Sequence, residues 1–350
     1  MGADQSVCLF HINNHLHNKA FSITLPQIIL FTCLISLLLL TGCESKLELH
    51  NVEKTLKEPI RRTDLLQAIK VNDSAIVVVA RSGVILVSSD NGRNWMRHEL
   101  ESWPSFIDVT SCSNGLFAAL AAEDEVWISE DNGQQWQQRK LETGETPQAI
   151  TCDQQNKLWV VGSFTTITSS IDGGQSWQST SLQEDAILTG IQFFNENQGV
   201  IVGEFGTVMT TQDGGINWEI QEPIINETYP LAMHFDDPQS GWIVSLSGII
   251  MHTSDGGQSW ESQKTDTVAS LFGINRIGDD LYAVGGEGII LRWQDNQWKT
   301  IHHNKPIRLH LRGIAEVDND HFLVAGRAGA LFLINKNNEI GVVPGDSSNG

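Results

Sequence analysis

Five short stretches of the chain place a hydroxyl, a carboxylate, a glycine and an indole in one order, Ser/Thr-x-Asp-x-Gly-x-x-Trp. An Asp next to Gly could suggest calcium, but an EF-hand loop supplies about six oxygen ligands over about twelve residues, and this spacing does not. The Asp and Ser or Thr side chains can instead accept hydrogen bonds from turn backbone N–H groups. We therefore expect structural turns without a metal, at Asp90, Trp95, Asp131, Trp136, Asp172, Trp177, Asp213, Trp218, Asp255 and Trp260.

These turns recur at a fixed interval. The five Trp residues lie 41, 41, 41 and 42 residues apart, which indicates a repeat architecture. Each unit reads as an apolar strand, a polar turn, a second strand, a Gly-containing turn, a third strand, the motif and a short fourth strand. Two further units, Leu271 to Trp298 and Leu311 to Ile334, fit this template without the complete motif. With a first unit near Leu65, the chain has seven units.

Seven units of four strands predict an all-β fold, a seven-bladed β-propeller. A linear solenoid is the competing arrangement, but the units contain only strands and neither end shows a polar capping repeat. The ring could close through Leu47 to Lys54, added to the last blade, or through the segment near Ile340. One aromatic residue near the start of the second strand recurs in most blades, and we expect this column to pack between blades: Phe117, Trp159, Trp242, Tyr282 and Phe322.

The N-terminal segment has the pattern of an export signal. Ile28 to Leu40 is an uncharged apolar run, shorter than the ~20 residues that span a bilayer, and Leu-Thr-Gly-Cys follows it. That tetrapeptide resembles a bacterial lipobox, in which Cys43 becomes the lipidated first residue; an uncleaved anchor or a buried thiol is the alternative. We expect an extracytoplasmic protein, lipid-anchored to the periplasmic or lumenal face of a membrane. The expected domains are a signal peptide over 1–42, a lipidated linker over 43–64, a propeller over 65–341 and a flexible tail over 342–350.

Two cysteines remain after Cys43. Cys112 and Cys152 follow corresponding points of consecutive repeats, and an oxidising compartment would permit a bridge between them. Two buried thiols are the alternative, because neighbouring repeats need not satisfy disulfide geometry.

The charge balance excludes one class of partner. Acidic residues outnumber basic ones by 42 to 22, so the protein repels phosphate backbones and nucleic-acid binding is not expected. The histidines His302, His303 and His310 share one blade connection without a rigid i, i+4 pair, and we expect no metal site there. His11, His15 and His17 would be removed with the signal peptide. We expect no cofactor.

The repeat wording carries a family resemblance. The pattern V-x-G-x-x-G-x-I-x-x-T-x-D-G-G-x-x-W, clearest in Ile201 to Trp218 and Ala283 to Trp293, is similar to the photosystem II assembly and stability factor family of cyanobacteria and plastids. The similarity extends over Leu65 to Asn335, and cyanobacterial members share the lipobox. This resemblance implies a non-catalytic propeller that holds an incompletely assembled membrane-protein subunit.

A glycoside hydrolase, sialidase-like or other, is the alternative, because propellers with this turn motif, the Asp-box, include such enzymes. A sialidase-like site needs an arginine triad and a tyrosine nucleophile, and the chain has just Tyr229 and Tyr282. Other glycosidases need only two carboxylates roughly 5 to 9.5 Å apart. No unit carries an insertion that would build a substrate cleft, so we assign no catalytic residue.

The turn between the second and third strands, which lies on the face opposite the Asp-box turns, reads Arg81, Ala122, Ser163, Glu204, Leu246, Gly286 and Arg327 across the seven units. Both arginines belong to the first and last blades, which are neighbours in a closed ring. The flanking connections add Lys57 and Lys305 and further arginines, so that we predict a partner-binding patch of Arg61, Arg62, Arg81, Arg308, Arg312 and Arg327.

This patch looks like the arginine patch that the family uses for its client; the alternative is solvated arginines paired with nearby acids. Arginine forms two parallel hydrogen bonds with a carboxylate, so an acidic tail or C-terminus of a membrane protein would fit. Phe164 and Phe205, on turns opposite the patch, could add an apolar contact.

Overall fold

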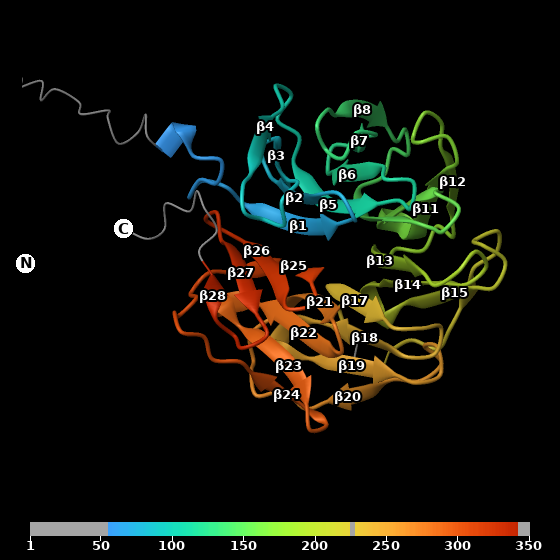
Figure 1. Ribbon diagram of the computed structural model, residues 1–350. Coiled ribbons are helices and arrows are strands. Elements are labelled where there is room, and N and C mark those ends of the chain that lie inside the picture. The colour runs from blue at the N-terminus through green and yellow to red at the C-terminus, as the bar shows by residue number, and fades with distance from the viewer. Residues whose placement is uncertain (1–54, 225–227, 342–350) are drawn as a thin grey trace, which may run out of the picture. The chain divides into compact units, whose positions relative to one another are not determined.

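The computed structural model describes residues 55–224 and 228–341. These residues form seven antiparallel sheets of four strands each, arranged as the blades of a ring, which confirms the predicted seven-bladed propeller (Figure 1). The proposed signal peptide, Cys43 and the C-terminal tail lie outside the described residues. Within the described part of the chain, no helix is long and apolar enough to cross a membrane.

Each blade runs in chain order from the innermost to the outermost strand. The first three blades are β1 (Leu66–Val71), β2 (Ile76–Ala80), β3 (Val84–Ser88), β4 (Met96–Glu99); β5 (Phe106–Ser111), β6 (Phe117–Ala121), β7 (Glu125–Ser129), β8 (Gln137–Lys140); and β9 (Pro147–Cys152), β10 (Leu158–Gly162), β11 (Thr166–Ser170), β12 (Gln178–Ser181). Blades four and five are β13 (Leu188–Phe193), β14 (Gly199–Gly203), β15 (Val208–Thr211), β16 (Glu219–Ile220); and β17 (Ala232–Phe235), β18 (Gly241–Val244), β19 (Ile250–Thr253), β20 (Glu261–Gln263). Blades six and seven are β21 (Leu271–Ile277), β22 (Asp280–Gly285), β23 (Ile290–Gln294), β24 (Gln297–Thr300); and β25 (Leu311–Asp318), β26 (His321–Gly326), β27 (Leu331–Asn335), β28 (Ile340–Gly341). Short 3-10 turns join the second and third strands of blades three to six: η1 (Ser163–Thr165), η2 (Glu204–Gly206), η3 (Leu246–Gly248) and η4 (Gly286–Gly288).

The ring closes between the last blade and the first. Each innermost strand packs against the next around the ring, and β25 packs against β1. The last blade is completed by its own β28, which pairs with β27, so of the two closures considered from sequence the one near Ile340 occurs. Figure 1 shows the blue β1 beside the red seventh blade. Blades one and seven are therefore neighbours.

The core consists of apolar layers between neighbouring blades. The second strands β2, β6, β10 and β14 are buried at every residue, as expected for strands covered on both faces. The aromatic column is also buried. For example, the ring centroids of Tyr282 and Phe322 lie 4.8 Å apart between blades six and seven. Aromatic rings of this size supply much of the apolar area that one blade buries against the next.

The segment before β1 packs against the propeller. Ile60 is buried in the apolar layer between blades seven and one. The buried carboxylate of Asp64 accepts two hydrogen bonds from the Arg97 guanidinium of β4, at 2.8 and 3.0 Å. This end of the segment that the sequence assigns to a linker is thus fixed to the first blade.

A disulfide joins blades two and three. Cys112, in the turn after β5, is bonded to Cys152 at the end of β9, and their Cα atoms are 5.2 Å apart. The two alternatives left open by the sequence are therefore resolved in favour of a bridge.

Candidate docking face

The strand order gives the propeller two unlike faces. The turns between second and third strands and the blade-to-blade connections lie on one, which we call the connection face. The Asp-box turns lie on the other, the Asp-box face. Backbone hydrogen bonds tie turns to connections: Gly83 N–H donates to the Pro104 carbonyl, and Gly329 N–H to the Asp64 carbonyl. Because both partners are backbone groups, these bonds do not depend on which side chains the turns display.

The Asp-box turns are closed networks. In blade three, Asp172 accepts hydrogen bonds from the backbone N–H groups of Gln175 and Ser176 at 3.0 and 2.9 Å and from the hydroxyl groups of Ser170 and Ser176. The Ser176 hydroxyl and backbone bonds are the main reason that the pKa of Asp172 falls to about 2. The buried Ser170 hydroxyl accepts from Gly174 N–H at 2.8 Å. These carboxylates already have their donors, which fits a structural role.

Three of the arginines selected from the sequence come together on the connection face. Arg81 lies in the β2–β3 turn, Arg327 in the β26–β27 turn and Arg312 on the second residue of β25, at the mouth of the central channel. All three are exposed, and among the described residues no carboxylate lies within ion-pair distance of their guanidinium groups. We call Arg81, Arg312 and Arg327 the arginine cluster.

The electrostatics of the cluster show that its charges interact. Arg312 is exposed at the channel mouth, yet the surrounding blades remove part of its hydration. That partial burial, together with the positive charges of Arg81 and Arg327, lowers the pKa of Arg312 below its usual value, and the Asp108 carboxylate opposes the shift. Three neighbouring positive charges produce a stronger positive potential than one arginine alone. The arginine cluster is therefore suited to a negatively charged ligand.

The other three selected arginines have different surroundings. Arg62 is exposed in the connection before blade one. Its backbone lies next to Gly329, so this connection runs beside the β26–β27 turn. Arg308 is exposed in the connection that follows blade six. Arg61 is half-buried and already bonded: its guanidinium donates to Glu99 at 2.6 Å and to the carbonyl groups of residues 56 and 58. For Arg61 the solvated-pair alternative describes the geometry better than a free binding group.

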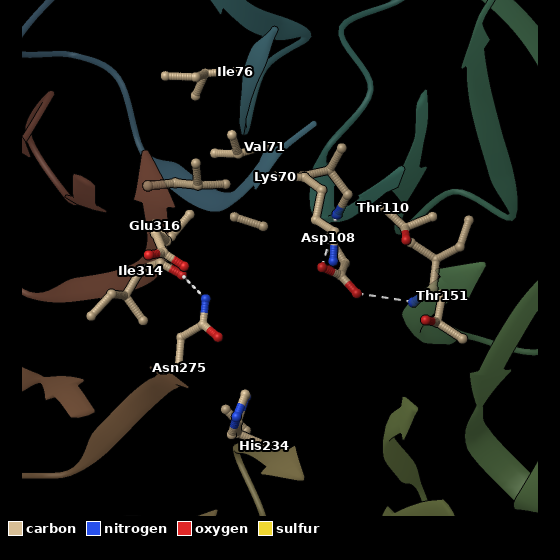
Figure 2. A pocket seen from close by; sticks show the side chains of 18 of the residues that line it. Lys70, Val71, Ile76, Asp108, Thr110, Thr151, His234, Asn275, Ile314 and Glu316 are labelled. Atoms are coloured by element: carbon tan, nitrogen blue, oxygen red, sulfur yellow. Dashed lines mark hydrogen bonds between the residues drawn. The ribbon is translucent and has the colours of Figure 1, made fainter. Parts of the chain in front are cut away.

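A polar channel of about 1120 Å³ runs along the innermost strands of all seven blades. Figure 2 shows Lys70 of β1 and Asp108 of β5 side by side in it, with His234 of β17 on another wall. The two Asp108 carboxylate oxygens accept from the Val109 and Ile150 N–H groups, at 2.8 and 2.9 Å. Burial nevertheless raises the pKa of Asp108 to about 6. Burial lowers the pKa of Lys70, and Asp108 opposes that change.

No motif in the sequence identified Lys70, Asp108 or the Arg97–Asp64 pair. The register of the innermost strands could have identified Lys70 but not Asp108, which lies two residues before the equivalent position in β5. That position is occupied in six successive blades by Lys70, Thr110, Thr151, Gln192, His234 and Asn275. Among the described residues no three His, Cys, Asp or Glu side chains gather as a metal site would require.

The tyrosines do not form a sialidase-like centre. Tyr282 is buried against Phe322. Tyr229 is half-buried in the connection before blade five, where burial and the Glu204 carboxylate raise the pKa of its hydroxyl, which opposes formation of a phenolate nucleophile.

A family model and several solved structures resemble this chain. The model described as photosynthesis system II assembly factor YCF48 matches residues 128–220, 175–262 and 221–339. A structure of YCF48 from Cyanidioschyzon merolae is 16% identical, with a TM-score of 0.65, over 79% of this chain and 97% of that one. A structure of YCF48 bound to D1 peptide is 17% identical, with a TM-score of 0.63, over 79% and 92%.

An enzyme shares the same fold. The virginiamycin B lyase of Staphylococcus aureus, solved with quinupristin as an inactive variant, is 16% identical with a TM-score of 0.67, over 77% of this chain and 94% of the lyase. At these identities the solved structures establish the propeller fold alone. No curated protein matches the chain in sequence.

Proposed function

Because the chain belongs to the photosynthesis system II assembly factor YCF48 family, we propose that it is a non-catalytic propeller that holds a membrane-protein subunit of photosystem II during assembly. The observation that carries the proposal is the arginine cluster, three exposed guanidinium groups without a carboxylate partner in the described structure, at the junction of blades one and seven. A relative solved with a D1 peptide supports a polypeptide client.

The cluster fits a client segment that ends in a carboxylate or carries acidic side chains. Each charge-assisted hydrogen bond from an arginine to a carboxylate contributes about 1.5–3 kcal/mol, or about tenfold or more in affinity. Arg62 and Arg308 lie in the flanking connections and would attract the same segment at longer range. Arg61 is left out of this binding group because Glu99 already holds it.

We also propose that the protein acts outside the cytoplasm, anchored by lipid at Cys43. Two observations support this location. The uncharged run before Cys43 has the length of a signal-peptide core, and the Cys112–Cys152 disulfide is typical of an oxidising compartment.

Co-purification tests the client. The variant with Arg81, Arg308, Arg312 and Arg327 all changed to Ala should lose at least about nine-tenths of the D1 that co-purifies with the wild-type protein. The matched control is Arg93→Ala with Lys336→Ala, which removes positive charge from the Asp-box face and should retain D1. Unchanged D1 in the quadruple variant would refute the arginine cluster as the docking site. Turnover of a glycan by the wild-type protein that stops on Asp108→Asn would refute the non-catalytic assignment.

A further inference from the structure

The connection face carries a second unusual feature, on the side of the ring away from the arginine cluster. Phe164 in the turn of blade three is 50% exposed and Phe205 in the turn of blade four is 62% exposed. Leu182, Leu246 and Val268, in the neighbouring connections and the turn of blade five, are also exposed. Large apolar side chains gathered on one face commonly mark a binding surface. We call these five residues the aromatic crescent.

Hydrogen bonds join the turns and connections that carry the crescent. The Phe164 carbonyl accepts from the Ser181 hydroxyl, which brings the Leu182 connection against the turn of blade three. The far end of that connection reaches blade four, because Glu204 N–H donates to the carbonyl of Ile187.

Similar bonds reach blade five. Gly206 N–H, next to Phe205, donates to the Thr228 carbonyl, and the Ser245 hydroxyl, next to Leu246, donates to the Tyr229 carbonyl. Gly248 lies against the backbone of Thr267 and Val268, since a Cβ at this position would clash with the Thr267 carbonyl and lie 3.3 Å from the Val268 Cα. The apolar side chains therefore stand on adjoining turns and connections from blade three to the connection after blade five.

The backbone at the two phenylalanines is strained. Phe164 and Phe205 have φ angles of 51° and 58°, in the left-handed region that bulky residues avoid. At the corresponding position four of the other five blades also have a positive φ, and their residues there are small or polar: Ser82, Ser247, Glu287 and Ala328. Asn or Gly would serve this turn better. A ring that is half exposed or more adds little to the core, and a bulky residue that keeps an unfavourable conformation at such a position points to a role in binding.

The charge around the crescent is opposite to that of the arginine cluster. Residues 141–270, counted over both faces of these blades, include 17 acidic residues against Lys157 and Lys264, and Asp185 is exposed in the same connection as Leu182. Glu184 and Glu222 are exposed in the connections on either side of blade four. Acidic side chains around an apolar centre fit an apolar ligand with positive charge at its edges.

We propose that the aromatic crescent is a second client contact, which binds an apolar polypeptide segment flanked by lysine or arginine. A membrane surface fits less well, because exposed carboxylates are repelled by the negative potential of anionic lipids. The inference rests on the proposed function in taking a polypeptide client. With the arginine cluster on blades seven and one and the crescent on blades three to five, a client with an acidic segment and an apolar, basic segment would bind in a single orientation.

Peptide binding tests the crescent. The probes are labelled synthetic peptides of Leu, Trp and Lys and matched peptides with Glu in place of Lys, titrated into the full-length protein and followed by fluorescence anisotropy. The variant is Phe164→Asn with Phe205→Asn, because Asn tolerates left-handed angles. The control is Ile171→Asn with Ile216→Asn, which removes two more exposed side chains, 82% and 81%, from the Asp-box face.

We expect the Lys peptide to bind the wild-type and control proteins and to bind the Phe164/Phe205 variant about tenfold or more weakly. The unfolding temperature of that variant should not fall, because the substitution relieves strain; a clear fall would show a structural role and overturn the proposal. Equal loss in the control, no binding of the Lys peptide, or equal binding of the Glu peptide would also overturn it.

Two further measurements separate this proposal from its competitors. If phosphatidylglycerol vesicles, and not the peptide, lose affinity in the Phe164/Phe205 variant, the crescent is a membrane contact and the proposal fails. Substitution of the arginine cluster by Ala should leave Lys-peptide affinity unchanged, within about twofold. If the Lys peptide does not bind the crescent but D1 binding is intact, the proposed function stands and the crescent proposal fails. If the Lys peptide binds as predicted but D1 does not bind, the crescent proposal stands and the proposed function fails.

Discussion

The disulfide between blades two and three gives the sharpest prediction about stability. The perturbation is Cys112→Ala with Cys152→Ala, which removes the bridge without placing a polar group at Cys112, a buried position. Cross-linking two residues 40 positions apart restricts the unfolded chain. By loop-closure entropy the restriction amounts to about 4 kcal/mol, between about 3 for a 15-residue loop and about 4.7 for a 100-residue loop.

That free energy converts into a measurable temperature. For a propeller of this size each kcal/mol shifts the unfolding midpoint by about 2 °C, so the double variant should unfold about 8 °C below the wild type. The assay is a thermal melt followed by circular dichroism. A reducing agent should lower the wild-type midpoint by a similar amount and should not change that of the variant.

Two results would refute this reasoning. If the midpoint of the wild type were the same with and without reductant, the bridge would not restrict the unfolded chain. If an intact-mass measurement of protein isolated from its native compartment showed free thiols at Cys112 and Cys152, the bridge would be absent in the cell, and one support for an extracytoplasmic location would be lost.

Three further predictions concern single sites. Ser170→Ala should destabilise the fold by about 1–3 kcal/mol in urea unfolding, because the buried Gly174 N–H loses its acceptor, and a change near zero would contradict the structural role of the Asp-box. Arg97→Met should cost about 3–5 kcal/mol in guanidinium unfolding, since it leaves the Asp64 carboxylate buried without its partner; a neutral effect would show that the segment before β1 is not fixed by this pair. The Asp108 carboxyl should titrate near pH 6 in a carbon-13 NMR experiment. Because burial raises its pKa in the folded protein above the unfolded value, the stability that its protonated form contributes is present below pH ~4 and lost as the pH rises through 6. A midpoint near 4 would contradict its burial.

The fold could be predicted because the information lies within each repeat. The regular spacing of Trp95 through Trp260, with four strand-like segments per unit, specifies seven equivalent blades. A closed ring then makes the first and last blades neighbours. That topology alone places Arg81 and Arg327 on adjoining turns of one face, as the structure shows.

The remaining features depend on contacts between blades, which no single repeat encodes. Whether Cys112 reaches Cys152 is set by the offset between two sheets, and the sequence shows only that both follow similar strands. Lys70 and Asp108 meet because consecutive innermost strands face one channel. Arg61 looks like its neighbour Arg62 in the sequence, but only coordinates show that Glu99, 38 residues away, holds it.

The backbone strain at Phe164 and Phe205 likewise has no signature in the sequence. The turn of blade four has the sequence Glu-Phe-Gly. Its Gly206 indicates a turn but does not predict the backbone angles of Phe205. Comparison of all seven turns shows that blades three and four alone, among the described turns, place a phenylalanine in the left-handed region. A sequence pattern gives the position of such a residue, but the free-energy cost of its backbone conformation follows only from the three-dimensional structure.

Cross-linking tests the central claim, that a client polypeptide binds the connection face at the junction of blades one and seven. A photoreactive peptide from D1 that ends in a carboxylate would be irradiated with the full-length protein and the linked residues identified by mass spectrometry. We predict links to the turns that carry Arg81 and Arg327 and to the start of β25, reduced by added salt because the contacts are between exposed charges. Links concentrated on the Asp-box turns, or spread evenly over both faces, would contradict the account.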